Sequence, residues 1–570
     1  MNHDELKILI DQGVLQRDPD KALVQKELQS LVDRGFIREL PNHFFEFDNN
    51  LTWEVVYETL LYAERRRLHA LVAQHIELQN RDHLDGVADV LAHHYEKSQN
   101  INKCVWYSAL AGKRAEEMYA NEDALSSFNK ALELSDLSSD VLASDKGILN
   151  EKIADVYVTV GKYSNAVECY GKSLELEKNN QSTRKSKLLP WKYRASIRES
   201  ELSNKIAVSF ERQSMYEKSI EWSNKAESAL PSRPGDIAAR IFATRSVALF
   251  RMGEYEQAIK YGKKSLTQAK RLNRKKDVAY AHNMLANSYI DMGNLKIAIR
   301  HLGEAVKLYS DEEYYPGMAS ANSNMGSCYM LLGKLDNAEE HFKLSINADE
   351  RLQNLSSLAM DHNNLGETLV AKGSIEEAKQ HLNYVVSRFK EKICPPDLTG
   401  LALINLSRCE IISGNYEKAE QYSREGLLLI ESVGQSWLRE EAEIQLVEVM
   451  YYQSKYARAE ELCRKVLESV EKQGMKLLKS RGLRVLGSIL NDTNRFDDAL
   501  EAVSESVQLA QFIGAEQEEA KSIVSMEKIK LSNSASSEET VNNLQRAIYM
   551  FESMGARFDL ADAERLRASM

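Results

Sequence analysis

The 570-residue sequence has little of what builds sheets, disulfide frameworks or membrane spans. Only 8 prolines are present and no β-branched stretch recurs, as expected of a mostly helical protein. The 6 cysteines lie far apart without a C-x-x-C pair, which indicates neither a zinc site nor disulfides and suits the reducing cytosol. No apolar run approaches the roughly 20 residues of a membrane span, and Met1 is followed by polar and acidic residues rather than by a basic and then apolar leader. We therefore expect a cytoplasmic protein.

Positive charge is outnumbered by negative charge. The chain has 74 Lys and Arg against 85 Asp and Glu, a net charge of −11. Because binding to nucleic acid depends on a positive surface that displaces counterions, this balance argues against general nucleic-acid binding.

Sequence signals for a catalytic, cofactor or metal site are missing as well. The phosphate-loop candidate is Gly171-Lys172-Ser173, but Ala166 stands where that loop needs a glycine, and the tripeptide lies within a predicted helix. Five histidines recur near a fixed period, but equivalent positions in stacked units lie on the order of 10 Å apart and cannot converge on one ion. These are His282, His301, His341, His362 and His381. We expect no catalytic residues, no cofactor and no metal.

What the sequence does contain is a repeat of about forty residues, clearest from Ala279 to Val385. Gly293, Gly333 and Gly373 are in register, and each is followed five residues later by an alanine. This marker position continues in both directions along the chain. The marker residues are Ala124, Ala166, Ser219, Ala258, Ala298, Ala338, Ala378, Ala419, Ala459 and Ala499, with Cys104 at an earlier equivalent position. A fixed period of this length is typical of stacked repeat arrays.

Each unit is predicted to be an amphipathic helix, a tight turn and a second, antiparallel helix. Small residues are needed where the helix axes approach to about 8–10 Å, and the turn glycine allows a positive φ. This pattern resembles the tetratricopeptide repeat (TPR), in a subclass with forty-residue units. The resemblance implies an all-α fold, a right-handed superhelix of about ten helix-turn-helix units.

The N-terminal residues differ from the repeats. Asp4–Gly13 and Lys21–Arg34 are predicted helices, Phe36–Leu40 and Phe44–Phe47 a hairpin, and Thr52 to about Leu78 one further helix. Two helices and a two-stranded wing suggest a winged helix. Residues 1–60 nevertheless contain 6 Lys and Arg and 12 Asp and Glu, a net charge of −6, so packing or regulation is favoured over DNA binding.

A second resemblance covers residues 1 to about 135. The segments 47–61, 66–73 and 91–95 are similar to the junction that follows the winged helix in STAND-class signalling ATPases and in related class III cyclases, where TPRs follow. It implies that the chain is the sensor end of such a protein. We divide the chain into a winged-helix-like segment (1–62), a helical junction leading into the repeats (63–135), the TPR array (136–530), and a terminal repeat with a capping helix (531–570).

The candidate binding residues are amides on the first helices, which line the concave side of arrays of this kind. Asparagine amides both donate and accept hydrogen bonds and can hold an extended peptide by its backbone. In the alternative interpretation they bond between neighbouring helices and touch no ligand. The predicted peptide-binding residues are Asn283, Asn287, Asn324, Asn363, Asn364, Asn405 and Arg408, with Tyr451, Tyr452, Arg481 and Arg484 as an extension.

The sequence thus favours a non-catalytic scaffold that binds a protein or peptide segment, as a sensor module of a signalling ATPase or cyclase relative. Two alternatives remain open: a transcription regulator whose winged helix reads DNA while the array senses a ligand, and the C-terminal part of an enzyme whose catalytic domain lies upstream.

Overall fold

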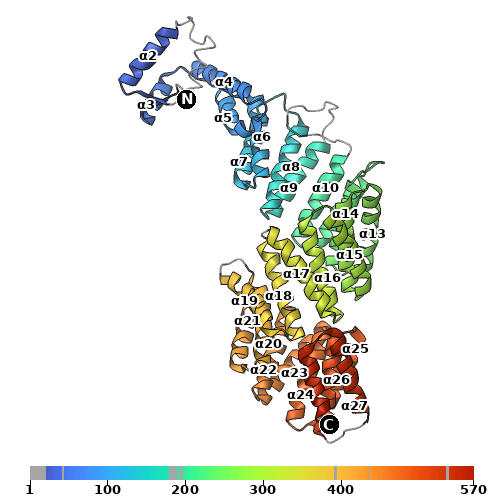
Figure 1. The fold of residues 1–570 in the computed structure, drawn as a ribbon. Coiled ribbons are helices and arrows are strands. Elements are labelled where there is room, and N and C mark those ends of the chain that lie inside the picture. Colours follow the sequence, from blue (N-terminus) through green and yellow to red (C-terminus); the bar gives the residue numbers. More distant parts are fainter. Residues whose placement is uncertain are drawn as a thin grey trace. The chain divides into compact units, whose positions relative to one another are not determined.

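The computed structural model describes residues 21–40, 44–178, 189–191, 197–352, 354–390, 394–433, 436–533 and 538–570. These residues form tandem helices with one two-stranded hairpin (Figure 1). The chain divides into two compact units, Met1–Met252 and Gly253–Met570. The predicted helix Asp4–Gly13 lies outside the described residues.

The N-terminal unit begins with a helix, a hairpin and two further helices. The antiparallel strands β1 (Ile37–Leu40) and β2 (Phe44–Phe47) form the predicted hairpin. Ile37 pairs with Phe47. Helical pairs then follow to the end of the unit. The helices are α2 (Lys21–Asp33), α3 (Asn50–Thr59), α4 (Tyr62–Gln79), α5 (Ala88–Lys97), α6 (Ile101–Glu117), α7 (Asn121–Ser135), α8 (Ala143–Thr159), α9 (Tyr163–Lys178), α10 (Arg198–Arg212), α11 (Tyr216–Ser228) and α12 (Ile237–Arg251), with a 3₁₀ turn at Leu84–Val87.

The prediction of one helix from Thr52 to Leu78 is wrong, because the chain is extended at Leu60 and Leu61. The break is stabilised by tertiary contacts: the Arg65 Nε donates to the Leu60 carbonyl at 3.0 Å, and the hydroxyl of Tyr57 on α3 lies 3.0 Å from Nε2 of His69 on α4. No glycine or proline marks this position.

The C-terminal unit consists of helices alone in its described residues. They are α13 (Tyr255–Arg271), α14 (Lys275–Asp291), α15 (Leu295–Asp311), α16 (Tyr315–Leu331), α17 (Leu335–Leu352), α18 (Leu355–Lys372), α19 (Ile375–Lys390), α20 (Pro396–Ile412), α21 (Tyr416–Ser432), α22 (Ser436–Tyr452), α23 (Tyr456–Gln473), α24 (Lys476–Asp492), α25 (Phe496–Ile513), α26 (Glu516–Ser532), α27 (Glu538–Met554) and α28 (Arg557–Ala568). The candidate phosphate loop lies within α9 of the other unit, as predicted.

The repeat register determines both packing and turn conformation. All eleven marker residues, Ser219 and Cys104 included, are fully buried. The residue five positions before each marker has a positive φ even where it is not glycine, as at Tyr119 (58°), Ser454 (58°) and Asn494 (60°). The position in the repeat therefore imposes the left-handed turn, and glycine only makes it less costly.

Small residues on the first helices admit the aromatic residues of the second helices. A Cβ placed on Gly326 of α16 would lie 2.8 Å from the ring of Phe342, which is fully buried on α17. Close approach of these two helices thus requires glycine at this position.

A matched pair of substitutions tests this packing. Gly326→Ala forces the Phe342 ring to move and should lower the free energy of unfolding by about 1–3 kcal/mol. Gly171→Ala on α9 meets open space and should raise it by roughly 0.5–1 kcal/mol, because alanine costs less backbone entropy in a helix. Urea unfolding followed by circular dichroism measures both, and shifts of the same sign would contradict the packing argument.

Within the C-terminal unit the array curves toward its first helices. Among the described residues, the first helices α14, α16, α18, α20, α22, α24 and α26 pack directly on one another in succession, whereas successive second helices have at most marginal contact. We call the surface that these seven first helices share the inner face.

Candidate functional site

The predicted asparagines form hydrogen bonds from helix to helix along the inner face. The Asn324 amide on α16 donates to Asn287 at 2.9 Å and to Asn283 at 3.2 Å, both on α14, and Asn283 donates to Ser320 at 3.1 Å. This is the arrangement that the alternative interpretation of these amides predicted, so the first asparagines in the row connect neighbouring units.

The next two units continue the row. The Asn405 amide on α20 donates to Asn363 on α18 at 3.3 Å and accepts a bond from Arg408 at 2.7 Å. Asn283, Asn363 and Asn405 are buried. Each of these amides has at least one hydrogen bond, which offsets the cost of burying it.

Asn364 differs from the other six predicted residues. It occupies the same repeat position as Asn324, fourteen residues before its marker alanine, and is half-buried. Of the predicted asparagines, Asn364 is the one whose side-chain amide has no hydrogen-bond partner among the described residues. Its backbone carbonyl accepts a hydrogen bond from the Thr368 hydroxyl at 2.9 Å. A half-buried amide of this kind retains two donors and an acceptor for a ligand.

Beyond the asparagines, the inner face continues as a ladder of alternating charges. Arg408 on α20 lies 3.3 Å from Glu367 on α18 and 2.8 Å from Glu441 on α22. Its Nε also donates to Gln445 at 3.1 Å. The row of charges then continues from α22 through Arg481 to α24 and α26.

At that end of the ladder, Glu448 joins two arginines of α24. It lies 2.9 Å from Arg481 and 3.2 Å from Arg484, and Arg484 is also 2.6 Å from Glu518 on α26. We call Glu367, Arg408, Glu441, Arg481, Glu448, Arg484 and Glu518 the charge ladder. The side chains of Arg408, Arg481, Arg484 and Glu448 are only 15–16% exposed.

Burial and pairing act in opposite directions on these carboxyls. Burial disfavours the charged form of Glu448, but attraction by Arg481 and Arg484 outweighs it and lowers its pKa to about 2. At Glu367 burial prevails over the attraction of Arg408, and the nearby Glu441 adds to it, so the pKa of Glu367 is raised. Four carboxyls face three guanidiniums, and Glu367, 37% exposed, is the acid that the ladder neutralises least.

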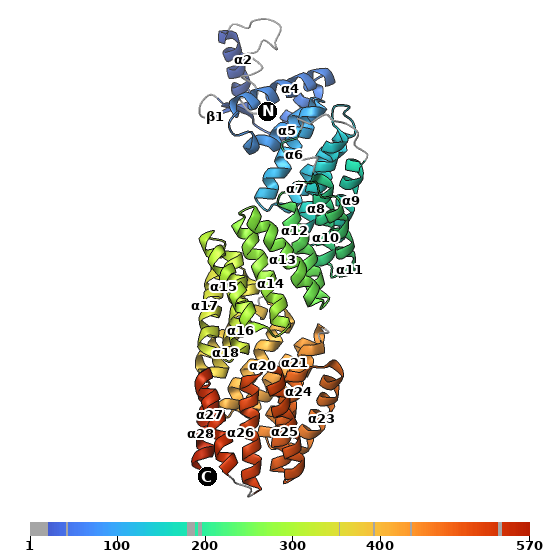
Figure 2. The same cartoon turned by 90° about the vertical axis from the view of Figure 1, so that its right-hand side faces the viewer.

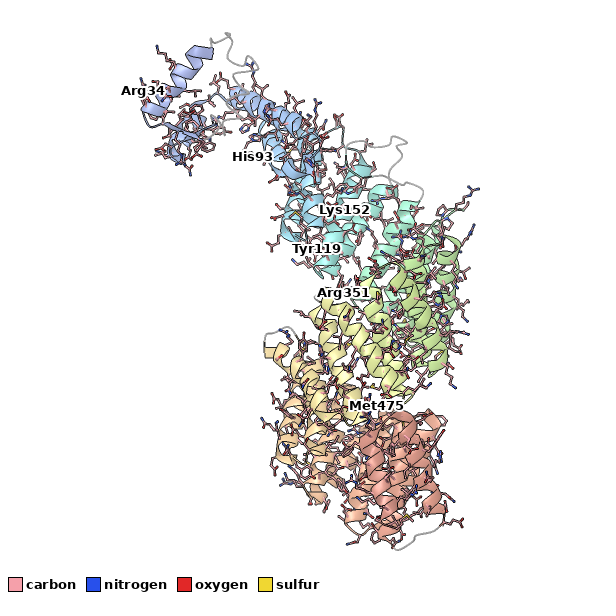
Figure 3. All side chains as sticks on the ribbon, viewed as in Figure 1. Arg34, His93, Tyr119, Lys152, Arg351 and Met475 are labelled. Carbon is pink, nitrogen blue, oxygen red and sulfur yellow. The ribbon has the colours of Figure 1, made fainter. Side chains whose placement is uncertain are left out.

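The N-terminal unit carries a comparable ion network on its own first helices. Lys205 on α10 lies 2.8 Å from Glu151 and 2.6 Å from Asp155, both on α8, and Glu151 also pairs with Arg198. Lys152, labelled in Figure 3, lies 3.4 Å from Glu116 on α6. Here the network contains three acids and three bases, so no charge is in excess.

The recurring histidines meet within units rather than along the array. Nδ1 of His282 on α14 lies 2.8 Å from Nδ1 of His301 on α15, and His362 and His381 meet in the same way at 2.7 Å. Nδ1 of His341 instead lies 2.9 Å from Asn322. Among the described residues, no group of three or more His, Cys, Asp or Glu could hold a metal ion.

Sequence reasoning placed the seven predicted residues on the correct helices but missed the acids that pair with the arginines. The adjacent carboxylates Glu440 and Glu441 do not lie on an exposed helix surface: Glu440 is 4% and the Glu441 side chain 21% exposed. The repeat register was the available signal, because Glu367, Arg408 and Glu448 each stand eleven residues before a marker alanine.

Comparison with protein families agrees with this geometry. The tetratricopeptide repeat family matches residues 149–180, 238–311, 283–350 and 317–391. These segments are tetratricopeptide repeats. The all-α superhelical TPR fold predicted from the sequence is therefore confirmed. A search of curated proteins gave no match.

Solved structures that match this chain are distant from it in sequence. The apo form of RapI is 14% identical with a TM-score of 0.51, over 65% of this chain and 98% of RapI. The apo quorum sensor NprR from B. thuringiensis is 14% identical, with a TM-score of 0.45 over 62% of this chain and 97% of that one. A STAND protein with a TPR sensor, PH0952 from Pyrococcus horikoshii, is 15% identical with a TM-score of 0.46, and the match spans 78% of this chain and 62% of that one.

Proposed function

We propose that the protein is a regulatory TPR module whose inner face in the C-terminal unit binds an extended segment of a peptide or protein. The observation that carries the proposal is Asn364, whose half-buried amide lacks a side-chain partner among the described residues while its neighbours in the row are hydrogen-bonded. An amide with free donors and an acceptor on an inward helix can bond to the backbone of a bound strand.

The charge ladder supplies a second element of recognition. Because the ladder has one more carboxyl than guanidiniums and Glu367 is both its least neutralised and most exposed acid, a basic group of the partner is the expected complement there. The remaining members pair with one another and hold the inner face in one geometry, which lowers the ordering cost of binding.

Binding by selected peptides tests the proposal. Linear peptides of random sequence displayed on phage would be selected on the purified chain, then synthesised with a fluorophore and titrated by anisotropy. Asn364→Ala should weaken binding about tenfold, the loss expected for one or two hydrogen bonds. Asn383→Ala, an exposed asparagine on the second helix α19 whose amide donates to the Lys379 carbonyl, is the matched control and should bind normally.

Two results would contradict the proposal. One is a selection that enriches no peptide on the intact chain. The other is equal affinity of the enriched peptides for the Asn364→Ala and Asn383→Ala variants.

The finer form of the proposal is a sensor in a signalling ATPase or cyclase relative, acting in the cytoplasm. It is supported by the sequence resemblance of residues 47–61, 66–73 and 91–95, by the helix–hairpin–helix order of residues 21–59, and by the six free cysteines. None of the described helices has the length and hydrophobicity of a membrane span. An upstream reading frame encoding a phosphate-binding loop or a cyclase domain would support it, and the absence of both from the coding sequence would argue against it.

A further inference from the structure

The last two helices of the C-terminal unit pack against turns that lie about 200 residues earlier in the chain. Leu335, 1% exposed at the start of α17, belongs to the same apolar cluster as Leu544, Phe551 and Met554 of α27. Figure 2 shows α27 and α28 directly below α18. The array of this unit therefore returns on itself.

Two turn glycines mark the contact. A Cβ on Gly333, after α16, would lie 2.6 Å from Sδ of Met554, and one on Gly373, after α18, would lie 3.2 Å from the backbone N and the Cβ of Phe558. Gly293 and Gly414 occupy the same repeat position with the same positive φ, yet a Cβ there would have nothing within 4 Å. Of these four turns, a side chain at Gly333 would collide with α27 and one at Gly373 would crowd Phe558 at the start of α28.

Helix α28 is held much less firmly than α27. In α27, six residues are buried, whereas Ala563 is the one fully buried residue of α28, and Phe558 is 40% exposed. Local opening requires little free energy where few apolar contacts are lost. Detachment of α28 thus leaves the packing of α27 on α26 intact.

The polar contacts of α28 place it at the end of the inner face. Asp559 lies 3.2 Å from Lys521 and accepts from Gln517 at 3.4 Å, both on α26. Gln517 and Lys521 flank Glu518, the last member of the charge ladder. Helix α28 therefore covers the end of the surface that we propose for binding.

We propose that α28 is a reversible latch: docked on the turns after α16 and α18 it closes the C-terminal unit, and released it opens the end of the inner face. Closure follows from contacts within this chain and does not depend on any partner. The consequence for binding rests on the proposed function, since a segment entering the inner face from this end competes with α28.

Substitution of the turn glycines tests the latch with matched controls. Asparagine adopts this left-handed turn at the equivalent position Asn494, so Gly373→Asn and Gly414→Asn should be tolerated alike by the turn. The Gly373→Asn side chain crowds Phe558 and displaces it. Amide hydrogen exchange of residues 557–568 should therefore become about tenfold faster than in wild type. In Gly414→Asn it should stay at the wild-type rate.

A charge reversal gives an independent test that leaves the turns untouched. Asp559→Lys places two ammonium groups together and should speed exchange of residues 557–568 about threefold, within the range of partly exposed ion pairs. The double variant Asp559→Lys/Lys521→Asp restores an opposite pair and should return exchange to near the wild-type rate.

Equal hydrogen-exchange rates of residues 557–568 in the Gly373→Asn and Gly414→Asn variants would overturn the latch. So would a double variant Asp559→Lys/Lys521→Asp in which these residues exchange as fast as in Asp559→Lys. These readouts need no ligand, so they stand even if no peptide binds the inner face. Where the selected peptides do bind, Gly373→Asn should bind them more tightly than Gly414→Asn; equal affinity would remove the competition while leaving the latch.

Discussion

Replacing Glu448 with glutamine is expected to lower the free energy of unfolding of the C-terminal unit by about 3 kcal/mol. Glu448 is 16% exposed and lies within 3.2 Å of both Arg481 and Arg484. These two arginines, acting against burial, hold its pKa at about 2, and a shift of this size corresponds to about 3 kcal/mol of stabilisation by the ionised form. Glutamine leaves two guanidiniums facing an amide in an enclosed site.

The pH dependence of this effect has a defined sign. Because the pKa of Glu448 is lower in the folded than in the unfolded chain, its contribution is fully present above about pH 4.5 and is lost as the pH falls toward 2. Urea unfolding at pH 7 and at pH 3 should therefore show a smaller difference between wild type and variant at the acidic pH.

Glu460 provides the matched control. It also pairs with two arginines, Arg464 and Arg495, but their side chains are 53% and 41% exposed. Glu460→Gln should cost no more than about 1 kcal/mol, as for other ion pairs at the surface. Equal costs for the two substitutions would show that the charge ladder contributes no more than ordinary surface charges.

The repeat period in the sequence predicted most of the array because packing recurs with it. Every marker residue is buried, and every residue five positions earlier has a positive φ. The register even succeeds at Tyr119, Ser214, Ser454 and Asn494, where no glycine signals the turn. A periodic steric requirement can therefore be recognised from one sequence, since it acts at the same position in each unit.

The pairings of the inner face could not be obtained in the same way. The repeat register identifies which residues face inward, but the partner of each depends on side-chain length and on the offset between neighbouring helices. Arg408, for example, bonds to Glu441, thirty-three residues onward, and to Glu367, forty-one residues back. The break at Leu60 and Leu61 was missed for a similar reason, because contacts from Arg65 and His69 stabilise it rather than a local signal.

The contact of α28 with turns earlier in the chain could not be predicted from the sequence either. The sequence predicted a capping helix within residues 531–570, and α28 spans Arg557–Ala568. The contact of α28 with Gly373, however, depends on the small rotation between one repeat and the next. This rotation accumulates over all the repeats of the C-terminal unit. The local sequence pattern thus predicts the helix itself, whereas the curvature of the whole array determines which residues this helix contacts.

Acidification from pH 6.5 to about 4 is expected to weaken the packing of α18 on α19 by about 2 kcal/mol, and that of α14 on α15 to a similar extent. A hydrogen bond between the Nδ1 atoms of His362 and His381, 2.7 Å apart, requires at least one neutral ring to accept it. Burial, reinforced by the neighbouring His381, lowers the pKa of His362 to about 4, and His282 behaves in the same way beside His301.

The sign follows from proton binding. Between about pH 6.5, the pKa of histidine in an unfolded chain, and pH 4, the unfolded state binds the proton that the folded state excludes, so stability falls as the pH falls. The full shift corresponds to about 3 kcal/mol for one ring. Because His362 is only half-buried, solvent screening reduces the expected loss to about 2 kcal/mol.

The double variant His362→Gln/His381→Gln isolates the contribution of this histidine pair to the loss of stability on acidification. Hydrogen exchange of α18 and α19 amides, corrected for intrinsic rates, gives the local stability at pH 7 and pH 4.5, and the loss on acidification should be smaller in the variant.

Asp361 on α18 acts in the opposite direction, because burial raises its pKa to about 6 and its protonated form favours folding at acidic pH. Asp361→Asn should therefore steepen the acid loss. Parallel pH profiles for the wild type and both variants would exclude the histidine pair and Asp361 as opposing determinants of acid stability in this unit.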